Sequence, residues 1–108
     1  MKKAKDSSKD VTVLMDMLAN KDGMLRQTAR EALVKVGKPA VPSLVQALQP
    51  SQPDQVRWEA AKALSAIGDA RSIPALVTTL EDPDYGVAWL AAEALRPFKQ
   101  VAWVWTAV

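Results

Sequence analysis

The chain has 108 residues, of which 49% are hydrophobic and 24% are charged, a balance typical of one soluble domain. It contains no cysteine and no histidine, which excludes disulfides, Cys/His metal sites and catalysis by a histidine or a cysteine nucleophile. The remaining carboxylates, lysines and hydroxyls form no convergent set. The sequence therefore predicts a protein without enzymatic activity, bound metal or cofactor.

The net charge of +2 belongs to the N-terminal segment. Residues 1–10 carry four lysines against two aspartates, whereas the charges of residues 11–108 balance. This predicts a flexible basic leader over residues 1–9. Four lysines make few phosphate contacts, so a solubilising leader is favoured over a nucleic-acid arm. We find neither a membrane-length apolar stretch nor an apolar segment after the lysines, and therefore expect no membrane contact, no secretory signal and a cytoplasmic location.

The first predicted element is a helix over residues 10–19. Its apolar residues follow helical spacing, and they are Val11, Leu14, Met15 and Leu18. A turn signal at residues 20–23 ends it. Because these residues match the second helix of the hairpin described below, we interpret the segment as a second helix whose first helix is absent. A first helix then follows over residues 25–37 and a second helix over residues 41–48, before a proline-containing linker at residues 49–53.

Residues 56–80 form the clearest predicted hairpin. Its first helix carries an apolar stripe made of Val56, Ala60, Ala63, Leu64 and Ile67. We expect Asp54 to cap the start of this helix and Gly68 to end it in a left-handed conformation. Pro74 stands near the start of the second helix, where its missing N–H costs nothing. After a break at residues 82–86, residues 87–98 repeat the first helix once more.

These segments are copies of one unit. The first helix that starts at Leu25 recurs at Val56 and at Val87, each time after 31 residues, and the second helix recurs after 32. All seven prolines and all four glycines fall at or near a proposed boundary. A repeat of this length predicts stacked helical pairs that bury their apolar faces only against their neighbours.

The letters that recur are Val56-Arg57, an alanine-rich helix, Ile67-Gly68-Asp69, Pro74-Ala75-Leu76 and Asp82-Pro83-Asp84. This pattern resembles HEAT-like repeats, in particular the short variety named after phycobilisome lyases, over about residues 11–98. The resemblance implies an all-α fold, a right-handed α-α superhelix of about three repeats. Two features depart from it: Ala88 stands where the repeat usually has arginine, and the second helix of the last repeat is barely present. Such repeats occur in scaffolds, lyase subunits and nucleic-acid enzymes alike.

The resemblance also implies that second helices line the concave side. Three rows of side chains then face outward there, and they are Asp16, Gln46 and Thr78; Met17, Ala47 and Thr79; and Val13, Ser43 and Ala75. These residues are small and mostly neutral, and none is a lysine or an arginine. A phosphate-binding groove requires such cations, so the rows favour a protein or peptide partner over nucleic acid. A merely solvated face is the equal alternative.

The outer side of the first helices carries two tryptophans in register. Trp58 and Trp89 lie opposite the apolar stripe, with Gln27 as their polar counterpart. They predict either an exposed apolar patch that binds a partner or a surface covered by a neighbouring segment. Two arginines at helix starts, Arg26 and Arg57, are expected to contact carboxylates between repeats. A further row suggests weak cross-repeat ion pairs, and its members are Glu31, Lys62 and Glu93.

The predicted division is a leader at residues 1–9, a repeat domain at residues 10–98 and an apolar tail at residues 99–108. The first helix of the last repeat lacks a second helix to cover its apolar stripe, so we expect the tail to cap it. If the tail does not dock within its own chain, the same groups drive formation of a homodimer. The leading function is a non-catalytic scaffold that binds a protein or peptide. One alternative is an accessory subunit of a bilin lyase or other enzyme complex, implied by the resemblance. The other is a weak nucleic-acid binder that acts through the lysine-rich N-terminus.

Overall fold

A computed structural model describes residues 7–98, with the side chains of residues 11–98. Within this range the chain forms α-helices and short 3-10 turns and no strand. The α-helices are α1 (Ser7–Met17), α2 (Gly23–Val36), α3 (Val41–Gln46), α4 (Asp54–Ile67), α5 (Ile73–Thr79) and α6 (Tyr85–Leu95). The 3-10 turns η1 (Lys38–Ala40) and η2 (Ala70–Ser72) lead into α3 and α5. The predicted all-α repeat fold is confirmed.

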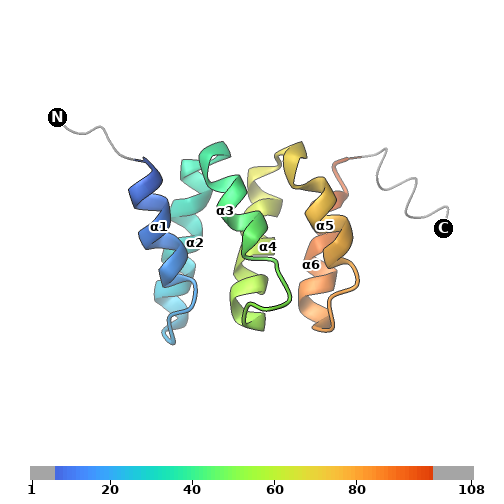
Figure 1. The fold of residues 1–108 in the computed structure, drawn as a ribbon, viewed down its shortest axis with the longest axis horizontal. Coiled ribbons are helices and arrows are strands. Elements are labelled where there is room, and N and C mark those ends of the chain that lie inside the picture. Colours follow the sequence, from blue (N-terminus) through green and yellow to red (C-terminus); the bar gives the residue numbers. More distant parts are fainter. Residues whose placement is uncertain (1–6, 99–108) are drawn as a thin grey trace.

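The helices form two layers, with α1, α3 and α5 in one and α2, α4 and α6 in the other (Figure 1). Helices α2, α4 and α6 stack in succession, and each helix of the other layer packs chiefly against the helix that follows it. The units in space are therefore three pairs, α1–α2, α3–α4 and α5–α6. The sequence predicts that α4 and α5 form one packed hairpin. This pairing is corrected, because α4 packs more extensively on α3 than on α5.

Two of the predicted helix boundaries are confirmed in detail. Gly68 follows α4 at φ 70° and ψ 30°, a left-handed conformation that closes the helix because its N–H bonds to the Leu64 carbonyl. Pro74 lies in the first turn of α5, where no intrahelical partner for its missing N–H is needed.

The predicted cap at Asp54 is wrong. The cap residue of α4 is Pro53, and Asp54 lies exposed within the first turn. The equivalent positions one repeat earlier and later are Asp22 and Asp84, whose carboxylates accept the N–H groups of Met24 and Val87 at 2.8 and 3.1 Å. Pro53 supplies the extended backbone that a cap requires, with φ −56° and ψ 147°, but has no side-chain acceptor.

The core runs through all three pairs. Its fully buried large side chains include Leu18, Leu33, Val41, Leu44, Leu64, Leu76 and Val87. The stripe of α6 is part of this interior, since Ala91, Ala94 and Leu95 are buried and α6 packs against both α4 and α5. The prediction that this stripe lacks a covering helix is therefore wrong, because α5 packs forward onto α6.

Helix α1 begins at Ser7, before the predicted domain boundary at residue 10. The remainder of the predicted leader, residues 1–6, and the predicted tail, residues 99–108, lie outside the described residues, so the capping role of the tail stays a prediction. None of the helices in the described part of the chain is long and apolar enough to cross a membrane.

Candidate functional site

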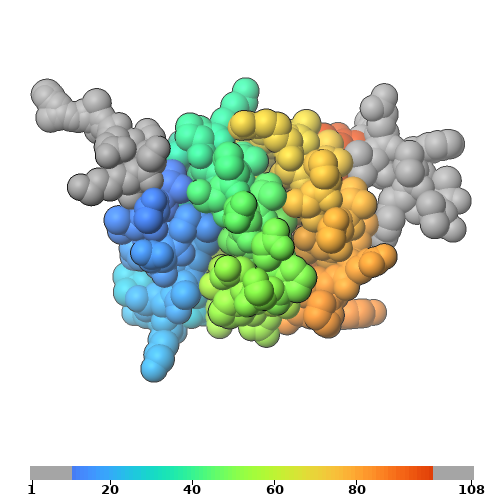
Figure 2. Space-filling view, viewed as in Figure 1, coloured from blue at the N-terminus to red at the C-terminus, as the bar shows by residue number. Residues whose placement is uncertain are grey.

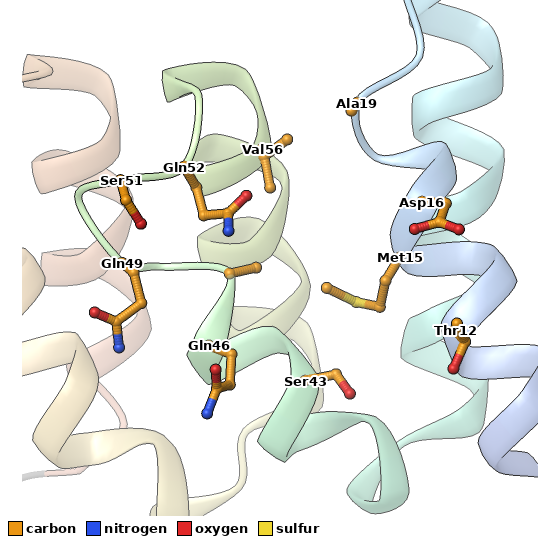
Figure 3. Close-up of a pocket in the computed structure, with 11 residues that line it drawn as sticks. Thr12, Met15, Asp16, Ala19, Ser43, Gln46, Gln49, Ser51, Gln52 and Val56 are labelled. Carbon is orange, nitrogen blue, oxygen red and sulfur yellow. The ribbon is translucent and has the colours of Figure 1, made fainter.

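A polar groove opens on the α1–α3–α5 layer, between α1, α3 and the loop of residues 49–53 (Figure 3). Its volume is about 750 Å³, and we call it the α1–α3 groove. The residues that line it are Thr12, Met15, Asp16, Ala19, Ser43, Gln46, Ala47, Gln49, Ser51, Gln52 and Val56. Two predicted site residues, Asp16 and Gln46, therefore face the same cavity from different helices.

The lining is rich in neutral hydrogen-bonding groups. Three glutamine amides, Gln46, Gln49 and Gln52, come from α3 and the following loop, and each offers both a donor and an acceptor. Among the described residues of the lining, Asp16 is the single charged one. The Met15 side chain extends from α1 into the space between the helices (Figure 3). Such a lining can bind a polar chain through hydrogen bonds while Met15 provides an adaptable apolar contact.

A smaller cavity of about 130 Å³ follows on the same layer, between α3 and α5. Its lining residues are Val45, Leu48, Gln49, Pro50, Ala75, Thr78 and Thr79. Thr78 is exposed here, and its hydroxyl donates to the Pro74 carbonyl at 3.2 Å. The predicted row of Asp16, Gln46 and Thr78 is thus exposed throughout, with Gln49 contacting both cavities.

The second predicted row is not exposed as expected. Thr79 is only 5% exposed, and its hydroxyl donates to the Ala75 carbonyl at 2.7 Å. Ala47 is equally buried. These positions turn inward because α3 and α5 pack forward onto α4 and α6. Thr79 therefore supports the end of α5 and offers little surface to a partner.

The two tryptophans differ in exposure. Trp58 is half-buried beside the start of α6: a Cβ added at Gly86 would lie 3.5 Å from the indole nitrogen. The Lys62 ammonium lies 4.6 Å from the Trp58 ring centre, and the Arg30 guanidinium lies 6.0 Å from it. Trp89 is 61% exposed. The expected patch of two exposed tryptophans is therefore reduced to Trp89, because the next pair covers Trp58.

Both helix-start arginines have the expected carboxylate partners. Arg57 donates to both oxygens of Asp82, from Nε at 2.7 Å and from Nη2 at 3.0 Å. Hydrogen bonding to Asp82 raises the pKa of Arg57 further above its ordinary value. Arg26 lies 3.4 Å from the carboxylate of buried Glu59, which also accepts from Arg30 at 2.7 Å. These contacts join successive pairs, so their role is structural.

The predicted row of Glu31, Lys62 and Glu93 forms no cross-repeat ion pair within the described residues. Glu31 accepts from Gln27 at 3.0 Å on its own helix, and Glu93 pairs with Arg96 at 3.1 Å. Lys62 instead lies over Trp58. Across residues 11–98, no group of three or more acidic side chains is close enough together to hold a metal ion.

The fold and the groove define an all-α solenoid with an open polar surface. Comparison with protein families gives a match to HEAT repeats over residues 11–96. The chain therefore belongs to the HEAT repeat family, whose members generally mediate protein–protein interaction. No match is found among curated proteins. The phycobilisome-lyase subtype stays a prediction.

Proposed function

We propose that this protein is a non-catalytic scaffold that binds an extended segment of another protein in the α1–α3 groove. The observation that carries the proposal is the composition of that 750 Å³ cavity: among residues 11–98 its lining supplies amides, hydroxyls and the Asp16 carboxylate, and no cation. An extended peptide presents alternating N–H and C=O groups, which the three glutamines can satisfy in either direction. A phosphate backbone would instead require lysine or arginine in the lining.

The lining also favours particular partner chemistry. Within the described part of the groove Asp16 provides the only charge, so a segment with one basic residue opposite it is preferred over an acidic one. Met15 adapts to apolar side chains of different shape, which suits a segment with one apolar residue near the centre of the groove. A second contact at the smaller cavity beside Thr78 would extend the bound segment toward α5.

Filling the groove tests the proposal. Ser43 lines it from α3 and is half-buried, so Ser43→Trp places a large side chain in the partner's path. Ala66→Trp is the matched control, because Ala66 is exposed on α4 and lies outside the groove. Partner proteins are first identified by capture from an extract of the source cell with the wild-type chain. The amount of each partner that the two variants capture is then measured, and the thermal melting of both variants is recorded.

We expect Ser43→Trp to reduce capture of a specific partner at least tenfold, while Ala66→Trp retains it and both variants melt near the wild-type temperature. A Gln46→Ala variant should weaken capture less than Ser43→Trp does, since it removes only one of the three glutamine amides that line the groove. Equal capture by Ser43→Trp and by Ala66→Trp would place the binding surface elsewhere and contradict the proposal.

A further inference from the structure

Exposed large apolar side chains in the described part of the chain lie only on its first and third pairs. On the first pair they are Val13, Met24 and Leu25, which are 55%, 75% and 40% exposed. On the third pair they are Val77, Tyr85 and Trp89, which are 42%, 93% and 61% exposed. These pairs stand at opposite ends of the molecule (Figure 2), and the middle pair carries none.

In the α1–α3–α5 layer, the direction in which Val13 and Val77 face follows from the residues at the equivalent positions of α3, inside the molecule. Val45 occupies the position of Val77 one repeat earlier, and it shares a cavity with Ala75 of the following pair. Ser43 occupies the position of Val13 one repeat later, and it shares a cavity with Met15 of the preceding pair. Val77 therefore faces away from the solenoid at one end and Val13 faces away at the other.

In the α2–α4–α6 layer, too, the exposed residues at the ends correspond to residues that contact the neighbouring pair inside the molecule. Inside the molecule, Trp58 of α4 packs beside Gly86 of α6. Trp89 occupies the position of Trp58 one repeat later, and Met24 occupies the position of Gly86 two repeats earlier. If the next helix stacked on α6 as α6 stacks on α4, its residue at the register of Met24 would meet Trp89. A methionine thioether beside an indole is a favourable contact.

The charges at these positions also match across the two ends. Where α2 meets α4, Arg26 and Arg30 face Glu59. Helix α6 has Ala88 and Ala92 at the positions of the two arginines, and α2 has Thr28 at the position of the glutamate. A contact between α6 and α2 would therefore leave no unpaired charge buried at this register, which is the costly defect of a mismatched interface.

We propose that a second copy of this chain docks its α1–α2 pair on the α5–α6 pair of the first and continues the solenoid. Val13 of the second copy then lies beside Val77 of the first copy, and Met24 lies beside Trp89. The two surfaces differ, so the contact is head-to-tail and each copy keeps one free end for a further copy. The α1–α3–α5 layer, with its groove, continues from copy to copy.

Complementary blocking of the two ends tests this arrangement. Trp89→Glu blocks one surface and Met24→Glu blocks the other, and both side chains are exposed, so folding should be retained. Ala66→Glu on the exposed side of the middle pair is the matched control. Molecular mass is measured by sedimentation over a wide range of concentration for each protein and for equimolar mixtures, and helix content is checked by circular dichroism.

We expect the molecular mass of the wild type and of Ala66→Glu to increase with concentration, from monomer through dimer to larger species. Each blocked variant should stay monomeric. A mixture of Trp89→Glu with Met24→Glu should form a dimer and nothing larger, because the pair retains one intact contact. The chain has no cysteine, so mixing Met24→Cys with Trp89→Cys under oxidation should give a linked dimer that neither variant forms alone.

Three outcomes would overturn the proposal. A wild type that stays monomeric at every concentration would show that residues of its own chain cover these surfaces. Association that survives Met24→Glu but not Trp89→Glu would indicate a symmetric contact between two α6 helices. A mixture of the two blocked variants that remains monomeric would exclude the head-to-tail contact directly.

Discussion

Asp82 is held by several groups at once. Its side chain is 4% exposed, and its carboxylate accepts two hydrogen bonds from Arg57 and one from the backbone N–H of Asp84 at 2.8 Å. Burial disfavours the charged carboxylate, but the bonds from Arg57 and Asp84 outweigh it and lower the pKa of Asp82 below its ordinary value. One side chain thereby joins α4 to the segment that leads into α6.

This lowered pKa predicts a loss of stability in acid. The unfolded chain takes up the proton near the ordinary pKa of about 3.9, before the folded protein does. The contribution of Asp82 is therefore fully present above that pH and is lost as pH falls through the lower pKa of the folded state. Nuclear magnetic resonance of the Asp82 carboxyl carbon measures that titration, and we expect a midpoint below about 3.9.

The matching variant is Asp82→Asn. It leaves the Arg57 charge buried without its carboxylate, which costs roughly 3–5 kcal/mol near neutral pH. The stability difference from the wild type should narrow progressively as the pH falls from about 4 through the lower folded-state pKa of Asp82, where the wild-type carboxylate becomes protonated as well. Asp16→Asn, at an exposed position, should follow the wild-type profile. A difference that stays constant from neutral pH to strong acid would contradict the ionic role of Asp82.

At the residue scale, the sequence predicts types of contact better than partners. The carboxylate partners of Arg26 and Arg57 were expected, but Glu59 and Asp82 occupy different positions in their repeats, so no shared spacing points to them. Thr79 was expected at the surface because it falls in register with exposed positions. The sequence does not reveal that α5 packs forward onto α6, and this packing buries Thr79.

At the element scale, two equivalent glycines end α2 and α4 in different ways. Gly68 has φ 70° and ψ 30° and is followed by Asp69, whose side chain caps η2. Gly37 has φ 76° and ψ −133°, because it ends α2 and also starts η1 in a turn one residue shorter. The first conformation is open to asparagine, whereas the second belongs to a region that only glycine adopts readily.

Replacing each glycine separately should therefore lower the free energy of unfolding by unequal amounts. We expect Gly68→Ala to destabilise the protein by about 1 kcal/mol and Gly37→Ala by about 2–3 kcal/mol. Crowding by residues beyond the two chain neighbours does not explain the difference, since a Cβ at either position meets none of their heavy atoms closer than 3.9 Å. Gly68→Asn should recover most of the loss, and Gly37→Asn should not. Chemical denaturation measures all four variants, and equal costs at the two positions would refute the conformational explanation.

Helix positions were largely predictable because proline and glycine mark the boundaries and the apolar stripes have helical period. The cap of α4 was misassigned because Asp54 carries the usual side chain, while the true position holds Pro53. Comparing Asp22 with Asp84 locates that position without a structure, since both precede a first helix by the same spacing. The α1–α3 groove was predictable only in part: Asp16 and Gln46 fall in one row, but Gln49 and Gln52 come from the connecting loop.

At the scale of the whole molecule, the two junctions between pairs are built from different interactions. The α2–α4 junction contains buried Glu59 between Arg26 and Arg30, whose side chains are 15% and 14% exposed and so are partly accessible to ions. The α4–α6 junction has Ala61 and Leu90 at the corresponding positions, both buried in the apolar core. Its own ion pair, Arg57–Asp82, is more deeply buried than the arginines of the first junction.

High salt should therefore destabilise the packing of the α1–α2 pair more than that of the α5–α6 pair. The screening length falls from about 30 Å at 0.01 M salt to about 3 Å at 1 M, and accessible ion pairs weaken while apolar contacts do not. Because each pair touches only its neighbours, opening of α1–α2 requires only the first junction to separate. We expect high salt to reduce hydrogen-exchange protection in α2 by about 1 kcal/mol more than in α6. Glu59→Gln should abolish that difference, since it removes the carboxylate that both arginines contact. Equal salt dependence in α2 and α6 of the wild type would show that the ion pairs do not set the strength of the first junction.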